Sequence, residues 1–478
     1  MGYLERIDSY REDMIRDLQE LIAIPGVAGE AEDNMPFGRD VHRALLHMLH
    51  MADQAGFDTY NGDNYGGHVE FGGYVIGEDG EKSVVTDETM GILVHLDVVP
   101  AGKDWDYPPF EGRVADGRIY GRGAIDNKGP AIAAFYAMKA LKEEGIVPRK
   151  KVRLILGLDE EAGTGWKGMD AYFARVEKPN FGFTPDAEFP AINGEMGILI
   201  FELAKKLGAS KRKGIELRTL TGGSAANMVA DQARAVLRAE SYDNIKALLE
   251  EYRKESGYKL SAKGMGKSLE IIASGVSSHG ARPELGLNAI SVLMGFLKKI
   301  EFANDDLTDF LDFYNDHIAF DLHGERIGCG LSDEVSGRLV FNVGMASVNP
   351  EVAGLTINIR YPVTMDDERV YKGMMPYLDK FNIGVVKLNH QEPIYIPADD
   401  PLIETLMGVY ARHTGDTASK PIVIGGGTYA RAIKNAVAFG MVFPGESELA
   451  HQKNESIFIE NLITSSKIFA DSIYELTK

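Results

Sequence analysis

The segment Gly91-Ile92-Leu93-Val94-His95-Leu96-Asp97 joins a short apolar run to an imidazole and a carboxylate. We expect residues 91–94 to form a short apolar strand that ends at His95. Positions i and i+2 of a strand point the same way, so Asp97 can lie beside His95 and accept its second ring N–H. A His–Asp pair that serves structure alone is the commoner explanation when the segment is taken by itself.

Apolar runs followed by acidic side chains recur further along the chain. Residues 152–158 form a largely apolar run, as expected of a strand buried on both faces of a parallel sheet, and residues 181–183 form a shorter one. The Ala-rich stretch 131–144 before them predicts a helix. Strands that alternate with helices indicate a doubly wound α/β layer, in which the chemistry collects beyond the carboxyl ends of the strands. The side chains expected at those ends are His95, Glu160, Glu161 and Asp186.

The middle of the chain has a different pattern. Residues 197–390 contain runs typical of antiparallel strands with amphipathic helices between them, which indicates an α+β insertion. After this insertion the α/β pattern returns, and a strand is expected over 437–443. The expected fold class is therefore α/β, with a doubly wound catalytic domain of residues 1–196 and 391–478 that is interrupted by an α+β lid domain.

The composition limits the possible partners. The 478-residue chain carries a net charge of −20, which argues against nucleic acid or an anionic membrane surface because both would repel it. The single cysteine, Cys329, excludes a disulfide within the chain and fits a reduced, cytoplasmic compartment. No apolar stretch is long enough to span a bilayer, and the N-terminus has no signal-peptide pattern.

Imidazoles and carboxylates are the side chains that hold divalent cations side by side. Asp126 lies in the glycine-rich turn 121–129, where glycines allow a carboxylate to project into a cleft; a cap for the following helix is the structural alternative. The acidic run 159–161 follows a core strand, and adjacent carboxylates away from water need a cation or raised pKa values. A solvated acidic loop is the alternative there, as a simple turn is for Asp186 and a surface loop for His451.

Two further positions bear on catalysis. If one of the adjacent glutamates Glu160 and Glu161 binds metal, the other is free to act as a base. His279 lies in a Gly/Ser-rich loop that leads into a helix, a suitable place for a donor to a developing oxyanion. An ordinary loop histidine is the alternative, and the residues alone favour it.

Taken together and in this order, the motifs resemble the dinuclear metallopeptidase family that includes glutamate carboxypeptidases, aminoacylases, desuccinylases and carnosine-type dipeptidases. The resemblance spans nearly the whole chain and is strongest to the bacterial dipeptidase V group. Each motif alone is weak, but five in the right order are specific. The supporting local phrases are Ala226-Asn227-Met228-Val229, Arg360-Tyr361-Pro362 and Gly425-Gly426-Gly427-Thr428-Tyr429-Ala430.

The resemblance implies two divalent cations, Zn²⁺ or Mn²⁺, held side by side. His95 and Asp186 would hold one cation, Glu161 and His451 would hold the other, and Asp126 would bridge them. Asp97 would orient His95. Glu160 would be the general base that takes a proton from a water or hydroxide shared by the metals and passes it to the leaving amine.

The resemblance also assigns lid residues to the substrate. His279 and Asn227 would polarise the scissile carbonyl. A free carboxylate on the substrate would be bound by the Arg360 guanidinium and by backbone N–H groups, and bidentate binding of this kind suits Arg. The residues assigned to that carboxylate are Arg360, Gly425, Gly426 and Gly427.

The implied activity is hydrolysis of unblocked L-dipeptides, so the expected partner is a small peptide. Family members with a lid of about half this length usually dimerise through it, so the long lid predicts a monomer with all site residues in one chain. An amidohydrolase of the same family acting on N-acyl amino acids is a second hypothesis. A non-catalytic peptide-binding protein on the same scaffold is a third.

Overall fold

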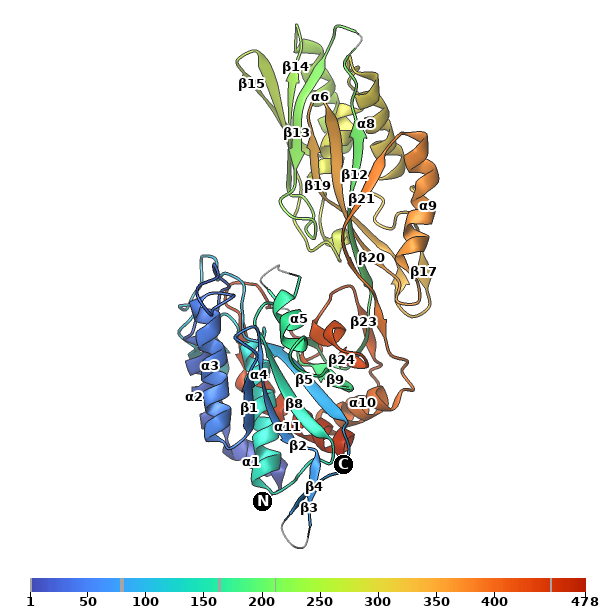
Figure 1. Cartoon of the computed structure of the whole chain (residues 1–478). Helices are drawn as coiled ribbons and strands as arrows, with labels where there is room; N and C mark the ends of the chain where they lie inside the picture. The colour runs from blue at the N-terminus through green and yellow to red at the C-terminus, as the bar shows by residue number, and fades with distance from the viewer. Residues whose placement is uncertain (1, 78–80, 162–164, 211, 448) are drawn as a thin grey trace. The chain divides into compact units, whose positions relative to one another are not determined.

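The computed structural model describes residues 2–77, 81–161, 165–210, 212–447 and 449–478 (Figure 1). The chain divides into two compact units, each with its own hydrophobic core. Unit 1 comprises Met1–Asn193, Ile396–Ile422 and Gly427–Lys478, and unit 2 comprises Gly194–Tyr395 and Val423–Gly426. The expected fold class is confirmed: a doubly wound α/β unit is interrupted by an α+β unit.

Unit 1 is built on a mixed sheet with the strand order β1-β2-β8-β5-β9-β24-β11. Strands β8, β5, β9 and β24 run parallel, whereas β2 and β11 are antiparallel to their neighbours. The bounds are β1 Asp58–Asn61, β2 Gly67–Gly72, β8 Lys151–Gly157, β5 Thr89–His95, β9 Phe181–Thr184, β24 Ala436–Ala438 and β11 Ile192–Glu195. The apolar runs of β5 and β8 are buried, as expected for central strands of such a sheet.

The central parallel strands of this sheet end at one edge. β5 ends at His95, β8 at Gly157 and β9 at Thr184, and the first two residues are register partners. Because parallel strands share one direction, the segments that follow them leave the sheet at the same edge. These segments carry the acidic residues singled out in the sequence.

Helix α4 (Lys128–Glu143) lies at the centre of the helical layer of unit 1. It is buried on nearly all sides because it packs against β5, α1, α2 and α11. It begins directly after the glycine-rich turn, so the core holds that turn in place. The other elements of unit 1 are α1 Tyr3–Ser9, α2 Arg11–Ile22, α3 Arg39–Gln54, β3 Tyr74–Ile76, β4 Lys82–Val84, β6 Arg113–Ala115, β7 Arg118–Tyr120, α5 Lys167–Phe173, β10 Ala187–Glu188, α10 Pro401–Thr414, η2 Tyr429–Ala432, β25 Met441–Val442, β26 Ser456–Phe458 and α11 Ile459–Thr477.

The prediction of a single strand over 437–443 is wrong. Two short strands replace it: β24 joins the main sheet, and β25 pairs in parallel with β10 in a separate sheet. Gly440 lies between them with a φ of 86°. A Cβ at this position would lie 2.4 Å from Phe189 Cζ, so only glycine lets the chain pass this ring.

Unit 2 consists of an eight-stranded antiparallel sheet with the order β15-β16-β14-β13-β19-β20-β12-β21 and of helices packed on it. Its strands are β12 Gly197–Lys206, β13 Glu216–Gly222, β14 Gln232–Arg238, β15 Lys259–Met265, β16 Ser268–Ser274, β19 Val340–Val348, β20 Val352–Tyr361 and β21 Gly384–Gln391. Its helices are α6 Asp243–Ser256, η1 Pro283–Leu285, α7 Ala289–Leu297, α8 Asp305–His317 and α9 Asp367–Lys380. Short strands are β17 Ser332–Asp333, β18 Gly337–Arg338 and β22 Ile394–Tyr395, and β23 comprises Ile422–Ile424. Across the described residues, every helix is too short or too polar to cross a lipid bilayer.

A polar cluster around Asp471 joins both ends of the chain in unit 1. The Asp471 carboxylate on α11 accepts hydrogen bonds from Tyr3 Oη at 2.5 Å, Arg412 Nη2 at 3.2 Å and His413 Nε2 at 2.9 Å. Burial alone would raise the pKa of Asp471, but the hydrogen bonds from His413, Tyr3 and Arg412 outweigh it and lower the pKa to about 2. Deprotonated Asp471 therefore stabilises the fold.

We expect Asp471→Asn to lower the free energy of unfolding at pH 7 by about 1 kcal/mol, after allowance for solvent screening. Because the folded pKa is depressed, this stabilisation is present above the unfolded pKa of about 4 and is lost as the pH falls toward 2. Urea unfolding of both proteins between pH 3 and 7 measures the effect. Asp8→Asn is the matched control, because Asp8 is an exposed carboxylate that forms an ion pair with Lys467. An Asp471 effect that does not shrink with falling pH would contradict the assignment.

Candidate metal centre

Asp126 lies between two imidazoles in unit 1. Its Oδ1 is 3.0 Å from His95 Nε2, and its Oδ2 is 3.1 Å from His451 Nε2. Strand β5 supplies His95, the glycine-rich turn before α4 supplies Asp126, and the loop before β26 supplies His451. Each oxygen of one carboxylate faces a different ring, so Asp126 belongs to the surroundings of both imidazoles.

Two groups of possible ligand atoms share Asp126. His95, Asp126 and Asp186 form one group, and Asp126, Glu161 and His451 form the other; within each, the atoms lie within 4.8 Å of one another. Glu161 Oε1 is 2.5 Å from His451 Nε2, and Asp186 Oδ2 is 3.6 Å from His95 Nε2. A third group contains His95, Glu160 and Glu161. Nitrogen and oxygen ligands in such sets suit divalent cations of the first transition row.

The electrostatics of this centre fit bound cations. Burial raises the pKa of Glu160 well above its usual value and also raises the pKa of Glu161, because carboxylates packed away from water resist ionisation. Hydrogen bonds to Asp126 and Glu161 raise the pKa of His451 to about 11. His95 Nε2 is buried and has no hydrogen bond of good geometry to any described residue. A cation would satisfy this nitrogen and let the carboxylates ionise.

Asp97 joins the end of β5 to the loop that carries the two glutamates. Its carboxylate accepts the backbone N–H groups of Glu160 at 3.2 Å and Glu161 at 2.8 Å. His95 Nδ1 is 2.9 Å from the backbone oxygen of Asp97 and 3.5 Å from its carboxylate. The second ring nitrogen of His95 therefore faces Asp97, as the spacing predicts, but the nearer acceptor is the main chain.

Asn127 is a residue of the centre that the sequence reasoning missed. Its Nδ2 donates to Asp186 Oδ1 at 3.0 Å and to the Pro185 oxygen at 2.9 Å, and its Oδ1 accepts the N–H of His95 at 3.3 Å. The side chain is fully buried. One amide therefore holds two possible ligands in place. The only local signal was its position next to Asp126, where a polar residue before a helix is usually a cap.

Asn227 and His279 come together on neighbouring loops of unit 2. The N–H of Gly280 donates to the backbone oxygen of Asn227 at 2.7 Å, and His279 pairs with Met228 as an isolated bridge. Asn342 of β19 supports this contact, because its Nδ2 donates to the backbone oxygens on both sides of Asn227 at 3.1 and 3.0 Å.

Arg360 and Gly425 are also neighbours within unit 2. Arg360 lies near the end of β20 and is 4% exposed. A Cβ placed on Gly425 would lie 3.6 Å from Arg360 Cγ and 3.2 Å from Ala281 Cβ. Gly426 belongs to the same unit, whereas Gly427 begins the last segment of unit 1. The lid residues thus gather in unit 2, and the possible metal ligands gather in unit 1.

Comparison with known families shows which family the chain belongs to. The profile of peptidase family M20/M25/M40 matches residues 91–475, a span that contains every possible ligand described above. The chain belongs to this peptidase family. Among curated M20 relatives, the YtjP protein of Bacillus subtilis (strain 168) is 38% identical over 473 residues, covering 98% of each chain. The Beta-Ala-Xaa dipeptidase of Lactobacillus delbrueckii subsp. lactis is 34% identical over 485 residues, covering 100% of this chain and 99% of the relative.

Solved structures with a similar fold cover nearly the whole chain. The aminoacylhistidine dipeptidase of Vibrio alginolyticus superposes with a TM-score of 0.58 at 15% identity, covering 97% of this chain and 96% of the other. Human carnosine dipeptidase 1 gives a TM-score of 0.53 at 18% identity, covering 99% of each chain. At these identities the similarity concerns the fold alone.

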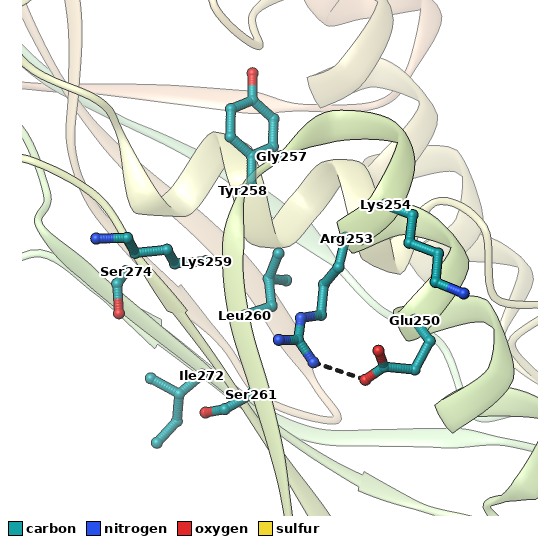
Figure 2. A pocket seen from close by; sticks show the side chains of 10 residues that line it. All are labelled: Glu250, Arg253, Lys254, Gly257, Tyr258, Lys259, Leu260, Ser261, Ile272 and Ser274. Carbon is teal, nitrogen blue, oxygen red and sulfur yellow. Dashed lines mark hydrogen bonds and ion pairs between the residues drawn. The ribbon is translucent and has the colours of Figure 1, made fainter.

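Unit 2 also has an open cavity of about 480 Å³ between the end of α6 and the edge strand β15 (Figure 2). Arg253 Nη1 is 2.7 Å from Glu250 Oε1 at its wall. Among the described residues that line it, none is one of the residues that the M20 resemblance assigns to the site. The lining residues are Glu250, Arg253, Lys254, Gly257, Tyr258, Lys259, Leu260, Ser261, Ile272 and Ser274.

Proposed function

We propose that this M20 peptidase is a dinuclear metallo-dipeptidase that hydrolyses unblocked L-dipeptides with Zn²⁺ or Mn²⁺. The observation that carries the proposal is the position of Asp126, whose two oxygens face His95 and His451 separately. The similarity to a Beta-Ala-Xaa dipeptidase along the full chain supports a dipeptide substrate. We further propose that the protein is cytoplasmic and acts as a monomer, for which light scattering should give the mass of one chain.

We assign the ligands as follows. His95 and Asp186 would hold one cation, Glu161 and His451 would hold the other, and Asp126 would be a ligand of both. When bound, the two cations polarise the scissile carbonyl and lower the pKa of a shared water toward neutrality. Asp97 keeps the glutamate loop in position through the N–H groups of Glu160 and Glu161.

Glu160 is the proposed general base. Its carboxylate belongs to the same cluster as His95 and Glu161, and burial raises its pKa, which suits a group that must accept a proton near neutral pH. Glu160 takes a proton from the attacking water and then gives it to the amine that leaves. Glu161, whose Oε1 contacts His451, remains a ligand.

Residues of unit 2 bind the substrate in this proposal. His279 and Asn227 donate to the carbonyl oxygen as negative charge develops on it. The free carboxylate of the dipeptide is bound by Arg360 and by backbone N–H groups of the loop Gly425–Gly427. The burial of Arg360 and its proximity to Gly425 support this, since a buried guanidinium is suited to bidentate binding of an anion.

A substrate panel tests the proposed function. We expect the Zn²⁺- or Mn²⁺-loaded protein to hydrolyse L-Ala-L-Ala with a kcat/KM at least about 100-fold above that for its N-acetyl or amide derivative, because blocking either end leaves buried polar groups unpaired. Product release is measured by chromatography, with each metal tested separately. Preferred cleavage of N-acetyl amino acids would favour the amidohydrolase hypothesis. Peptide binding without turnover under either metal would favour a binding protein.

A further inference from the structure

Glu455 is a buried carboxylate beside the metal centre that the proposed reaction does not use. It lies in the last position before β26, four residues after His451, and is fully buried. Its Oε1 accepts three backbone N–H groups of the glycine-rich turn: those of Gly123 at 3.0 Å, Ile125 at 3.0 Å and Asp126 at 3.2 Å. One carboxylate oxygen thus fixes the backbone on which Asp126 is mounted.

The other oxygen of Glu455 connects this turn to the His451 loop. Oε2 accepts from Arg122 Nη1 at 2.6 Å, and this guanidinium is itself buried at 2% exposure. Arg122 Nη2 reaches the backbone oxygen of His451 at 3.3 Å. The backbone oxygen of Glu455 also accepts the N–H of Gly121 at 2.9 Å. The ion pair of Arg122 and Glu455 therefore connects the glycine-rich turn to the His451 loop. Asp126 of the turn and Glu455 are 329 residues apart in sequence.

The contacts of Glu455 suit a carboxylate, because both of its oxygens accept hydrogen bonds. Three N–H groups that converge on one oxygen form an anion-binding nest, and the guanidinium adds a full positive charge on the other side. Glutamine has the same shape as glutamate, but it would place an NH₂ group against these donors. A buried donor would then face other donors, which leaves polar groups unsatisfied and shifts the turn.

We infer that Glu455 is a positioning residue of the metal centre: it orients Asp126 so that its two oxygens face His95 and His451, and through Arg122 it fixes the His451 loop. This inference rests on the proposed metal centre. Residues that hold metal ligands in place without touching the metal determine how tightly the metal binds. Glu455 therefore controls the affinity for the pair of cations, and the side chains of unit 2 that bind the substrate carboxylate are not involved.

The test is metal affinity, measured by chelator competition on the full-length protein. We expect Glu455→Gln to bind the weaker of the two cations about 10–100-fold less tightly than the wild type. The absorption spectrum of the Co²⁺-substituted variant should change, because the bridging carboxylate is turned. At saturating metal, kcat should fall while KM stays within about twofold, a split that general destabilisation does not produce. Glu460→Gln is the matched control, because Glu460 is an exposed glutamate on α11.

Arg122→Lys provides a second variant in case Glu455→Gln does not fold. Lysine keeps the charge beside Glu455 but cannot reach both Glu455 and the backbone oxygen of His451. The Arg122→Lys variant should therefore bind the same cation less tightly, by a similar factor. Unchanged metal affinity and an unchanged Co²⁺ spectrum in a folded variant would overturn the inference, even if thermal stability fell. A wild-type protein that binds no cation would instead refute the proposed metal centre, so the two failures can be told apart.

Discussion

Replacing Glu160 with glutamine is expected to lower turnover by about 10²–10⁴-fold while both cations remain bound. Glutamine keeps the shape of the side chain and the backbone N–H contact with Asp97, but it cannot accept a proton. The site would still bind metal and dipeptide, so KM should change little. Steady-state kinetics with L-Ala-L-Ala and metal analysis of the same sample measure both quantities.

Glu177→Gln is the matched control for this experiment, because Glu177 is an exposed glutamate of the same unit. Turnover of Glu160→Gln within tenfold of the wild type would contradict the base assignment. Loss of one cation together with turnover would instead indicate that Glu160 is a ligand, as the cluster of His95, Glu160 and Glu161 permits.

Replacing Asp126 with alanine is expected to weaken the binding of both cations and to abolish activity. Its two oxygens are 3.0 and 3.1 Å from separate imidazoles, so under the proposed assignment one substitution would remove a ligand from each cation. The loss of affinity should exceed the roughly 10–100-fold that removing an outer partner of a metal ligand costs. Titration calorimetry on protein freed of metal by a chelator measures affinity and stoichiometry together.

Asp186→Ala gives the contrast that makes this test specific. Asp186 belongs to the group around His95 and not to the group around His451, so the binding of only one cation should be weakened. For the wild type, chelation should abolish hydrolysis and added Zn²⁺ or Mn²⁺ should restore it. Full activity of the chelated protein, or loss of a single cation from Asp126→Ala, would contradict the shared role of Asp126.

The parts of the fold that follow from local sequence were predicted well. The apolar runs 91–94 and 152–158 are the central strands β5 and β8, since a strand buried on both faces has to be apolar throughout. The change of pattern near residue 197 reflects a real second core. The strand expected over 437–443 was wrong because the position of the Phe189 ring, which forces the break at Gly440, cannot be read from the local sequence.

The residues of the candidate metal centre likewise divide into those that the sequence predicted and those that it did not. The ends of parallel strands explain why His95 and Asp186 lie near each other, whereas the pairing of ligands came from the resemblance and stays a prediction. Asn127 and Glu455 were missed because most of their partners are backbone groups of distant segments. A carboxylate that binds main-chain N–H groups has no residue-type signature, since every non-proline residue offers the same donor.

The position of β24 in the sheet has a consequence for how the chain folds while it is being synthesised. This strand lies between β9 and β11, yet it is translated after all of unit 2. A ribosome that has finished β9 and β11 has therefore produced a sheet with a missing middle strand, while the long stretch Gly194–Tyr395 already has the residues of its own core. The nascent chain must keep the opening between β9 and β11 accessible until residues 436–438 emerge. His451 is translated after residues 436–438. A nascent chain that has not yet reached His451 therefore lacks one of the proposed metal ligands and cannot hydrolyse peptides by the proposed mechanism.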